Sequence, residues 1–130
     1  MRLDTPGAGF TDVTANFIAQ AGCGEGTLLI FLHHTSASLV IQENADPDVR
    51  TDLTTALRRL APDDAGWIHE TEGPDDMPAH VKAMLGSVSL QVPVGGGKLK
   101  LGTWQGIYLI EHRRAPHARD IVLQFIGGRK

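Results

Sequence analysis

The sequence predicts an α+β fold in which two mostly antiparallel β-sheets pack face to face as a sandwich, together with two to three helices. Short runs of β-branched and leucine residues, many alternating with polar residues, indicate six or seven strands. Two other stretches, residues 46–60 and 76–85, place apolar residues at helical spacing. Strands in such number beside so few helices are typical of a sheet-on-sheet core.

The first third of the chain predicts one helix between strands. Residues 1–9 are weakly patterned and indicate an arm or a short edge strand. Thr11 or Asp12 can cap a helix that runs to about Ala21 and ends at Gly22. Its apolar stripe is Val13, Phe17, Ile18 and Ala21. Residues 27–33 then form a continuous apolar run, which is typical of a strand covered on both faces, and residues 38–42 form a second strand.

Two helices are predicted in the middle of the chain. Asp46 and Pro47 are a strong helix start, and this helix ends before Pro62. Its apolar face is Val49, Leu53, Ala56, Leu57 and Leu60. Asp76 can cap the other helix, which Gly86 ends. The apolar face of that helix is Met77, His80, Val81, Met84 and Leu85.

The remaining segments predict strands and turns. Residues 67–69 suggest a short strand before an acidic loop. Alternation predicts strands over 88–92 and around 99–101, joined as a hairpin by the glycines 95–97. Residues 104–113 predict a longer strand, and residues 121–126 predict the last one. In the longer strand, alternation points Glu111 and Arg113 to one face and His112 to the other.

Composition narrows the class of protein. A chain of 130 residues corresponds to one domain, residues 1–130. The net charge of −3 and the lack of a basic run argue against nucleic acid as a partner. The lone Cys23 excludes an internal disulfide and a cysteine-rich zinc site, and favours a cytoplasmic location. No apolar run approaches the roughly 20 residues that a membrane span needs, so we expect no membrane partner.

Three histidines are candidate metal ligands. His80 is predicted in the first turn of its helix, where the positive helix end disfavours the imidazolium, and a divalent metal needs a neutral imidazole. His69 precedes the acidic loop, and His34 ends a buried strand. Three histidines and a water molecule would form an open site for zinc, with magnesium at Asp75 and Asp76 as an alternative. The competing interpretation makes His80 a hydrogen-bonded core residue.

Polar residues at strand ends are candidate substrate ligands. Thr35, Ser36 and Ser38 can hold phosphate oxygens, although hydroxyl groups at this position are equally typical of a plain turn. Glu43 and Asn44 close the same segment. We assign Glu43 a catalytic role and Asn44 a substrate-binding role.

The end of the 104–113 strand supplies two further candidates. Arg113 can clamp a phosphate bidentately, and His112 can transfer a proton or bind a metal. The alternative is a surface pair between Glu111 and Arg113, which contributes little to stability. No P-loop, dinucleotide fingerprint or nucleophile elbow is present in the sequence.

Four stretches together identify a family. They are GFTDVT (9–14), HTSASLVIQENAD (34–46), HETEGPDDMPAHVKAMLG (69–86) and VPVGGGKLKLGTWQGIYLIEHR (92–113). In these stretches the chain resembles the secondary thiamine-phosphate synthase family, also called the YjbQ family. The resemblance extends from about Gly9 to Phe125, which is nearly the whole chain.

The resemblance implies a β-sandwich that trimerises around a three-fold axis, with a metal-associated site near the subunit boundaries. Matched residue by residue, it assigns the metal to His34, His69 and His80. It gives His112, in the Glu-His-Arg motif, a role toward the substrate.

The resemblance also implies a reaction. Hydroxymethylpyrimidine diphosphate would be joined to a thiazole phosphate with loss of diphosphate. Two alternatives from other classes stay open. One is a trimeric protein that binds a metal and a phosphorylated metabolite without turnover, and the other is a metal-dependent hydrolase of a small phosphorylated compound.

Overall fold

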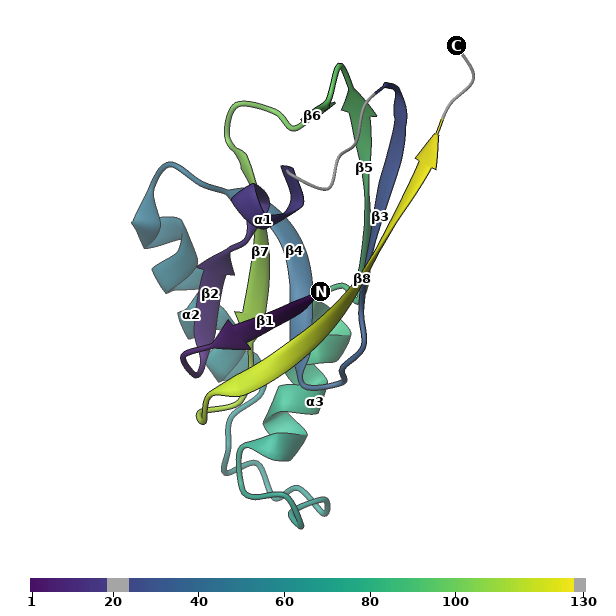
Figure 1. The fold of residues 1–130 in the computed structure, drawn as a ribbon. Coiled ribbons are helices and arrows are strands. Elements are labelled where there is room, and N and C mark those ends of the chain that lie inside the picture. The colour runs from purple at the N-terminus through teal and green to yellow at the C-terminus, as the bar shows by residue number, and fades with distance from the viewer. Residues whose placement is uncertain (19–23, 128–130) are drawn as a thin grey trace.

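The structure, a computed structural model, describes residues 1–18 and 24–127, and within them it has two antiparallel sheets (Figure 1). The larger sheet has the order β1 (Arg2–Thr5), β8 (His117–Gly127), β3 (Gly26–Leu32), β5 (Ser89–Gly95) and β6 (Lys98–Leu99). The smaller sheet has the order β2 (Gly9–Asp12), β7 (Gln105–Glu111) and β4 (Ala37–Glu43). The predicted α+β class with two antiparallel sheets is confirmed.

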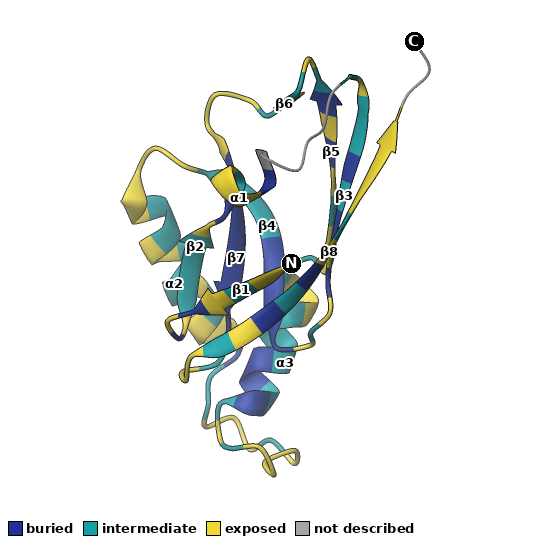
Figure 2. Cartoon of the chain, viewed as in Figure 1, coloured by how far each residue is buried: buried dark blue, intermediate teal, exposed yellow. Residues whose placement is uncertain are grey.

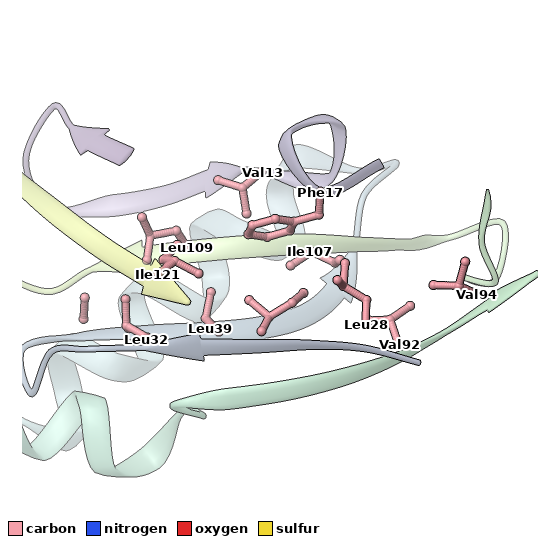
Figure 3. Packing of buried hydrophobic residues seen from close by; sticks show 12 residues of the cluster. Val13, Phe17, Leu28, Leu32, Leu39, Val92, Val94, Ile107, Leu109 and Ile121 are labelled. Atoms are coloured by element: carbon pink, nitrogen blue, oxygen red, sulfur yellow. The ribbon is translucent and has the colours of Figure 1, made fainter. Parts of the chain in front are cut away.

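The core lies between the two sheets (Figure 3). Alternation along β3 turns Leu28, Ile30 and Leu32 inward, because successive side chains of a strand point to opposite faces. Leu39, Ile107 and Leu109 of the smaller sheet face them and are at most 1% exposed. Each such side chain stabilises the fold by roughly 1.5–3 kcal/mol when fully buried.

The helix α2 (Pro47–Leu60) begins where the sequence predicts. The side chain of Asp46 accepts a hydrogen bond from the backbone N–H of Asp48 at 2.9 Å, and Pro47 occupies the first turn. None of its residues is buried, however, and Leu60 is 65% exposed (Figure 2). The predicted apolar face is therefore only partly covered.

The helix α3 (Asp76–Leu85) differs from the prediction at its start. Asp75, and not Asp76, is the capping residue, and its side chain makes no capping hydrogen bond. The buried residues are Asp76, Pro78 and Ala79, whereas Met84 of the predicted apolar face is 79% exposed. Gly86 ends the helix as predicted. A Cβ atom there would lie 2.6 Å from Ser38, so glycine lets the helix end approach β4 closely.

The N-terminal elements are partly as predicted. β1 is an edge strand, paired with β8, but residues 9–12 form β2 and not the start of a helix. The helix α1 (Thr14–Ile18) follows, and Asp12 accepts hydrogen bonds from the backbone and hydroxyl of Thr14. Val13 and Phe17 are buried as predicted. The predicted continuation to Ala21 and Gly22 lies outside the described residues.

Other segments complete the comparison with the prediction. The 95–97 hairpin is confirmed, and Gly96 and Gly97 have positive φ angles of 59° and 73°. Residues 67–69 form no strand and pair with no other segment in the described ranges. The indole N–H of Trp67 donates to the carbonyl of Pro62, and Ile68 is 98% exposed. No helix in the described part of the chain is long and apolar enough to cross a membrane.

Candidate functional site

Three side chains converge where the loop 61–75 meets the start of α3. The Nε2 atom of His69 lies 2.7 Å from Oδ2 of Asp76, and Nε2 of His80 lies 3.2 Å from the same oxygen. All three donor atoms lie within 4.8 Å of one another. Asp76 is 4% exposed, while the imidazole of His69 faces solvent more openly. We call His69, Asp76 and His80 the His–Asp–His cluster.

Two of the three cluster residues, His80 and Asp76, have a second hydrogen-bond partner on the side away from the cluster. The Nδ1 atom of His80 lies 2.9 Å from the carbonyl oxygen of Thr35, and because a carbonyl only accepts, this nitrogen must donate. The Oδ1 atom of Asp76 accepts from Arg113 at 2.9 Å. These partners leave Nε2 of His80 and Oδ2 of Asp76 turned toward the cluster, as outer partners of metal ligands do.

The electrostatics of the cluster favour a positive charge at its centre. Burial opposes ionisation of Asp76, but the hydrogen bond from His69 and the charges of His80 and Arg113 outweigh it and lower the pKa of this carboxyl. A neutral His80 that donates through Nδ1 presents a lone pair at Nε2 to the Asp76 carboxylate. These two groups repel each other unless a proton or a cation lies between them. Two imidazole nitrogens and one carboxylate oxygen form a donor set that suits zinc.

The guanidinium of Arg113 is fully engaged with the acidic loop and the start of α3. Its guanidinium donates to Asp75 at 3.1 and 3.3 Å, to Asp76 at 2.9 Å and to the carbonyl of Glu72 at 2.7 Å. Burial opposes ionisation of Asp75, yet the hydrogen bonds from Arg113 and the backbone of Arg114 lower its pKa. In this conformation Arg113 has no free fork for a phosphate, and its contacts position Asp76.

His34 lies beside the cluster but does not join it. Its Nε2 accepts a hydrogen bond from the backbone N–H of Asp120 at 2.7 Å, and its Nδ1 lies 3.3 Å from the guanidinium of Arg119. Burial, and then the charge of Arg119, lower the pKa of His34. It shares a cavity of about 270 Å³ with His80. Within one chain, therefore, the third donor beside His69 and His80 is Asp76.

The three hydroxyl residues serve different purposes. Thr35 has an exposed side chain and supplies its carbonyl to His80. Ser36 is buried and accepts a hydrogen bond from Arg119 at 3.0 Å. Ser38 is fully buried, with its Oγ 2.6 Å from Nε2 of His112. The structure therefore places the hydroxyls of Ser36 and Ser38 inside the protein, away from a shared phosphate position.

His112, Glu43 and Asn44 lie outside the His–Asp–His cluster. His112 is 5% exposed, and burial, followed by the charge of Lys82, lowers its pKa to about 4. Glu43 and Asn44 lie at the opposite end of β4, where Glu43 accepts from the backbone of Asp46. Six residues of strand separate them from Ala37, which corresponds to about 20 Å. One chain does not bring these candidates together.

Sequence reasoning missed the part played by three residues. Asp76 was assigned mainly to helix capping, although its i, i+4 spacing to His80 would place both on one helix face. Glu111 and Arg119 form a buried ion pair between the sheets, which Thr5 joins with a 2.6 Å hydrogen bond. No local pattern near Arg119 indicates this pair, because its partner lies on another strand.

The protein is therefore an α+β protein of two antiparallel sheets, with a His–Asp–His cluster beside the edge of the smaller sheet. Comparison with protein families matches residues 3–128 to the UPF0047 protein YjbQ-like family. The chain therefore belongs to the YjbQ-like family.

Relatives and solved structures agree with this assignment. The UPF0047 protein sll1880 of Synechocystis is 48% identical over 85% of this chain and 76% of its own length. UPF0047 protein YjbQ of Escherichia coli O157:H7 is 40% identical over 98% and 95%. The structure of the conserved hypothetical protein TT1486 from Thermus thermophilus is 33% identical, covers 97% of this chain and 99% of its own, and has a TM-score of 0.86. None of these names gives an activity, so the synthase activity stays a prediction.

Proposed function

We propose that His69, Asp76 and His80 bind a divalent cation, and that the protein acts there on a small phosphorylated metabolite. The convergence of two imidazole Nε2 atoms on one carboxylate oxygen supports this proposal most directly. Zinc is the first candidate, because nitrogen donors suit it better than they suit magnesium. Three protein ligands leave a position open, which is typical of catalytic zinc sites and favours turnover over binding alone.

The surroundings of the cluster have room for a substrate. A groove of about 980 Å³ lies along residues 65–71 beside His69, and the cavity next to His80 adds about 270 Å³. A bound cation would polarise a phosphoryl oxygen and offset the charge that develops on a leaving phosphate or diphosphate. The chain's own contribution is to hold that position: Asp76 stays ionised and oriented by Arg113, and His80 is fixed by the carbonyl of Thr35.

The reaction proposed first is thiamine-phosphate synthesis, in which hydroxymethylpyrimidine diphosphate is joined to a thiazole phosphate and diphosphate leaves. The family resemblance supports this choice, and so does the need of a leaving diphosphate for a cation. The open donor set equally suits a metal-dependent hydrolase of a small phosphorylated compound. A metabolite-binding protein without turnover is the third possibility, and the assay below separates the three.

We also propose that the protein acts as a homotrimer in the cytoplasm. The outer face of the larger sheet carries Phe31, Val122 and Ile126, which are 40, 44 and 54% exposed. The helices α2 and α3 do not cover this face, since they lie beside the smaller sheet (Figure 1). A closed ring of three copies would bury these side chains. Light scattering at micromolar concentration should give three times the chain mass, and a monomer mass would contradict the trimer.

The metal proposal is tested by zinc titration calorimetry. We expect wild-type protein to bind one zinc ion per chain. Asp76→Asn should weaken zinc by roughly 100-fold or more, because losing a ligand costs at least as much as losing an outer partner. Glu70→Gln is the matched control, since this exposed carboxylate adjoins His69 but lies outside the cluster. Equal affinities in the two variants would contradict the site.

The reaction is tested by supplying both phosphorylated precursors and measuring thiamine phosphate and released phosphate. We expect His80→Ala to lose metal and activity while the oligomer survives, because His80 lies at the surface of α3 and outside the core. Synthesis is supported if wild type forms thiamine phosphate and His80→Ala does not. Hydrolysis is supported if wild type releases phosphate when only one of the two precursors is supplied. Equal trace rates in wild type and His80→Ala would leave the binding protein as the function.

A further inference from the structure

A second cavity lies on the outer side of the smaller sheet, under α2 and beside α3. Its mouth, of about 430 Å³, is lined by Arg58, Lys82, Arg114 and His112 among others. Its inner part, of about 150 Å³, is apolar and includes Phe10, Leu53, Leu57 and Ile110. Lys82 and His112 line both parts, so the two parts adjoin at these side chains. We call this cavity the helix groove.

At the mouth of the helix groove, the acidic side chains are already paired with cations or hydrogen-bond donors, while two basic side chains are not paired within the described residues. Arg114 pairs with Asp63, and Asp75 accepts hydrogen bonds from Arg113 and from the backbone of Arg114. Glu111, at the end of β7 next to His112, turns its carboxylate between the sheets, where it is paired with Arg119.

Lys82 and Arg58 are the cations that remain. Neither makes an ion pair or a side-chain hydrogen bond with any residue in the described ranges. The two like charges at this groove repel each other, and an anion between them would remove that repulsion.

His112 supplies a neutral donor at the floor of the same groove. Its Nε2 is engaged by Ser38, and its Nδ1 has no hydrogen-bond partner in the part of the chain that the structure describes. No side-chain nitrogen or oxygen atom there is both fully buried and unpartnered, so Nδ1 reaches the groove. When the Ser38 hydroxyl donates to Nε2, the ring proton lies on Nδ1 and points toward a bound anion.

We propose that the helix groove binds an organic phosphate monoester. The phosphate lies at the mouth, where Lys82, Arg58 and His112 donate to its oxygens. The organic part, a small ring, lies in the apolar inner part against Phe10 and Leu57. This site lies outside the His–Asp–His cluster, and binding there requires no cation in that cluster.

The test is calorimetry with phenyl phosphate as the probe, on protein kept free of metal with EDTA. We expect phenyl phosphate to bind at least about tenfold more tightly than inorganic phosphate or phenol, because only it fills both parts of the groove. Lys82→Gln should weaken it about tenfold or more, as expected for loss of a charge-assisted hydrogen bond. Arg58→Gln should weaken it in the same direction and, because Arg58 is exposed on α2, it does not threaten the fold.

Two controls decide the outcome. Arg59→Gln removes the neighbouring exposed charge on α2, outside the groove, and should leave the affinity unchanged. His80→Ala alters the metal cluster and should also leave it unchanged. The proposal is overturned if Arg58→Gln and Arg59→Gln behave alike, if inorganic phosphate binds as tightly as phenyl phosphate, or if binding needs added zinc and disappears in His80→Ala. The last result would place the phosphate at the cluster.

Discussion

Two carboxylates in this protein are each bound by an arginine, but one lies between the sheets and the other lies beside partly exposed histidines. Between the sheets, Glu111 accepts hydrogen bonds from Arg119, from Thr5 and from the backbone of Arg113. At the start of α3, Asp76 accepts from Arg113 through one oxygen and turns the other toward His69 and His80. Both carboxylate residues are at most 4% exposed.

The difference lies in what the second carboxylate oxygen faces. Both oxygens of Glu111 are satisfied by donors inside the protein, and the guanidinium of Arg119 also donates to the carbonyl and hydroxyl oxygens of Ser36. The second oxygen of Asp76 instead meets the imidazoles of His69 and His80, whose side chains are 42% and 32% exposed. The carboxylate of Glu111 therefore has only partners from the interior, whereas that of Asp76 is shared with side chains that solvent reaches.

The largest expected effect comes from opening the pair of Glu111 and Arg119. Arg119→Ala should cost about 3–5 kcal/mol in the free energy of unfolding, because it leaves Glu111 buried without its charge partner. The control is Arg2→Ala, which removes the exposed pair with Asp120 and should cost far less, because water screens an exposed ion pair. Urea unfolding measures both. Similar losses in the two variants would show that the interior pair is not structural.

A pH titration of stability should give the next largest effect, and it also reports on the interior. His112 has its pKa lowered from 6.5 to about 4, by burial first and then by the charge of Lys82. Between these values the unfolded chain binds the proton and the folded chain does not, so stability falls as the pH drops from about 6.5 to 4. The loss should approach about 3 kcal/mol.

The variant His112→Gln isolates that contribution. Glutamine can keep a hydrogen bond to Ser38 but does not titrate, so its stability should depend less on pH between 4 and 6.5. The lowered pKa of Glu111 acts in the same direction at lower pH, in both proteins, since its folded carboxylate resists protonation by virtue of the hydrogen bonds from Arg119 and Thr5. Parallel curves over this range would show that His112 is not kept neutral by burial.

A smaller effect is expected on the zinc affinity of the His–Asp–His cluster when Arg113 is replaced. Arg113→Lys keeps the positive charge but loses the planar fork that contacts both Asp75 and Asp76. We expect zinc affinity to fall roughly 10- to 100-fold, as for other outer-shell partners of metal ligands. Arg59→Lys on α2 is the control. Zinc binding equal to that of wild type would mean that Asp76 is oriented without Arg113.

The sequence predicted what local patterns determine. Asp46 and Pro47 define the start of α2 because capping and proline geometry act within one turn. The apolar run of β3 and the glycines after β5 likewise predicted their elements. The pairing of β1 with β8 joins residues more than a hundred positions apart, and nothing in either segment alone specifies the partner.

At the candidate site, too, the sequence predicted the residues that lie close along the chain and missed contacts that depend on the fold. His69 and His80 were predicted as ligands and do meet, because His69 lies in the loop that leads into α3 and His80 lies near the start of that helix. Asp76 was assigned to capping, since an aspartate at a helix start is typical of a cap, and only the fold turns its side chain back to the two histidines. His34 was predicted from its place at a strand end, where the pattern does not show which neighbour takes its ring nitrogens.

The smallest expected effect is on His34, and it distinguishes the two ligand sets. We expect His34→Gln to change zinc affinity by less than about threefold, because Nε2 of His34 already accepts the backbone N–H of Asp120 and the Arg119 cation lies at its Nδ1. A glutamine oxygen can take over the bond to Asp120, so the fold should be kept. His69→Gln is the matched comparison and should lose zinc binding strongly. If His34→Gln loses as much as His69→Gln, His34 is a ligand after all, and the three-histidine site is assembled in a conformation or by a neighbouring subunit that a single chain does not show.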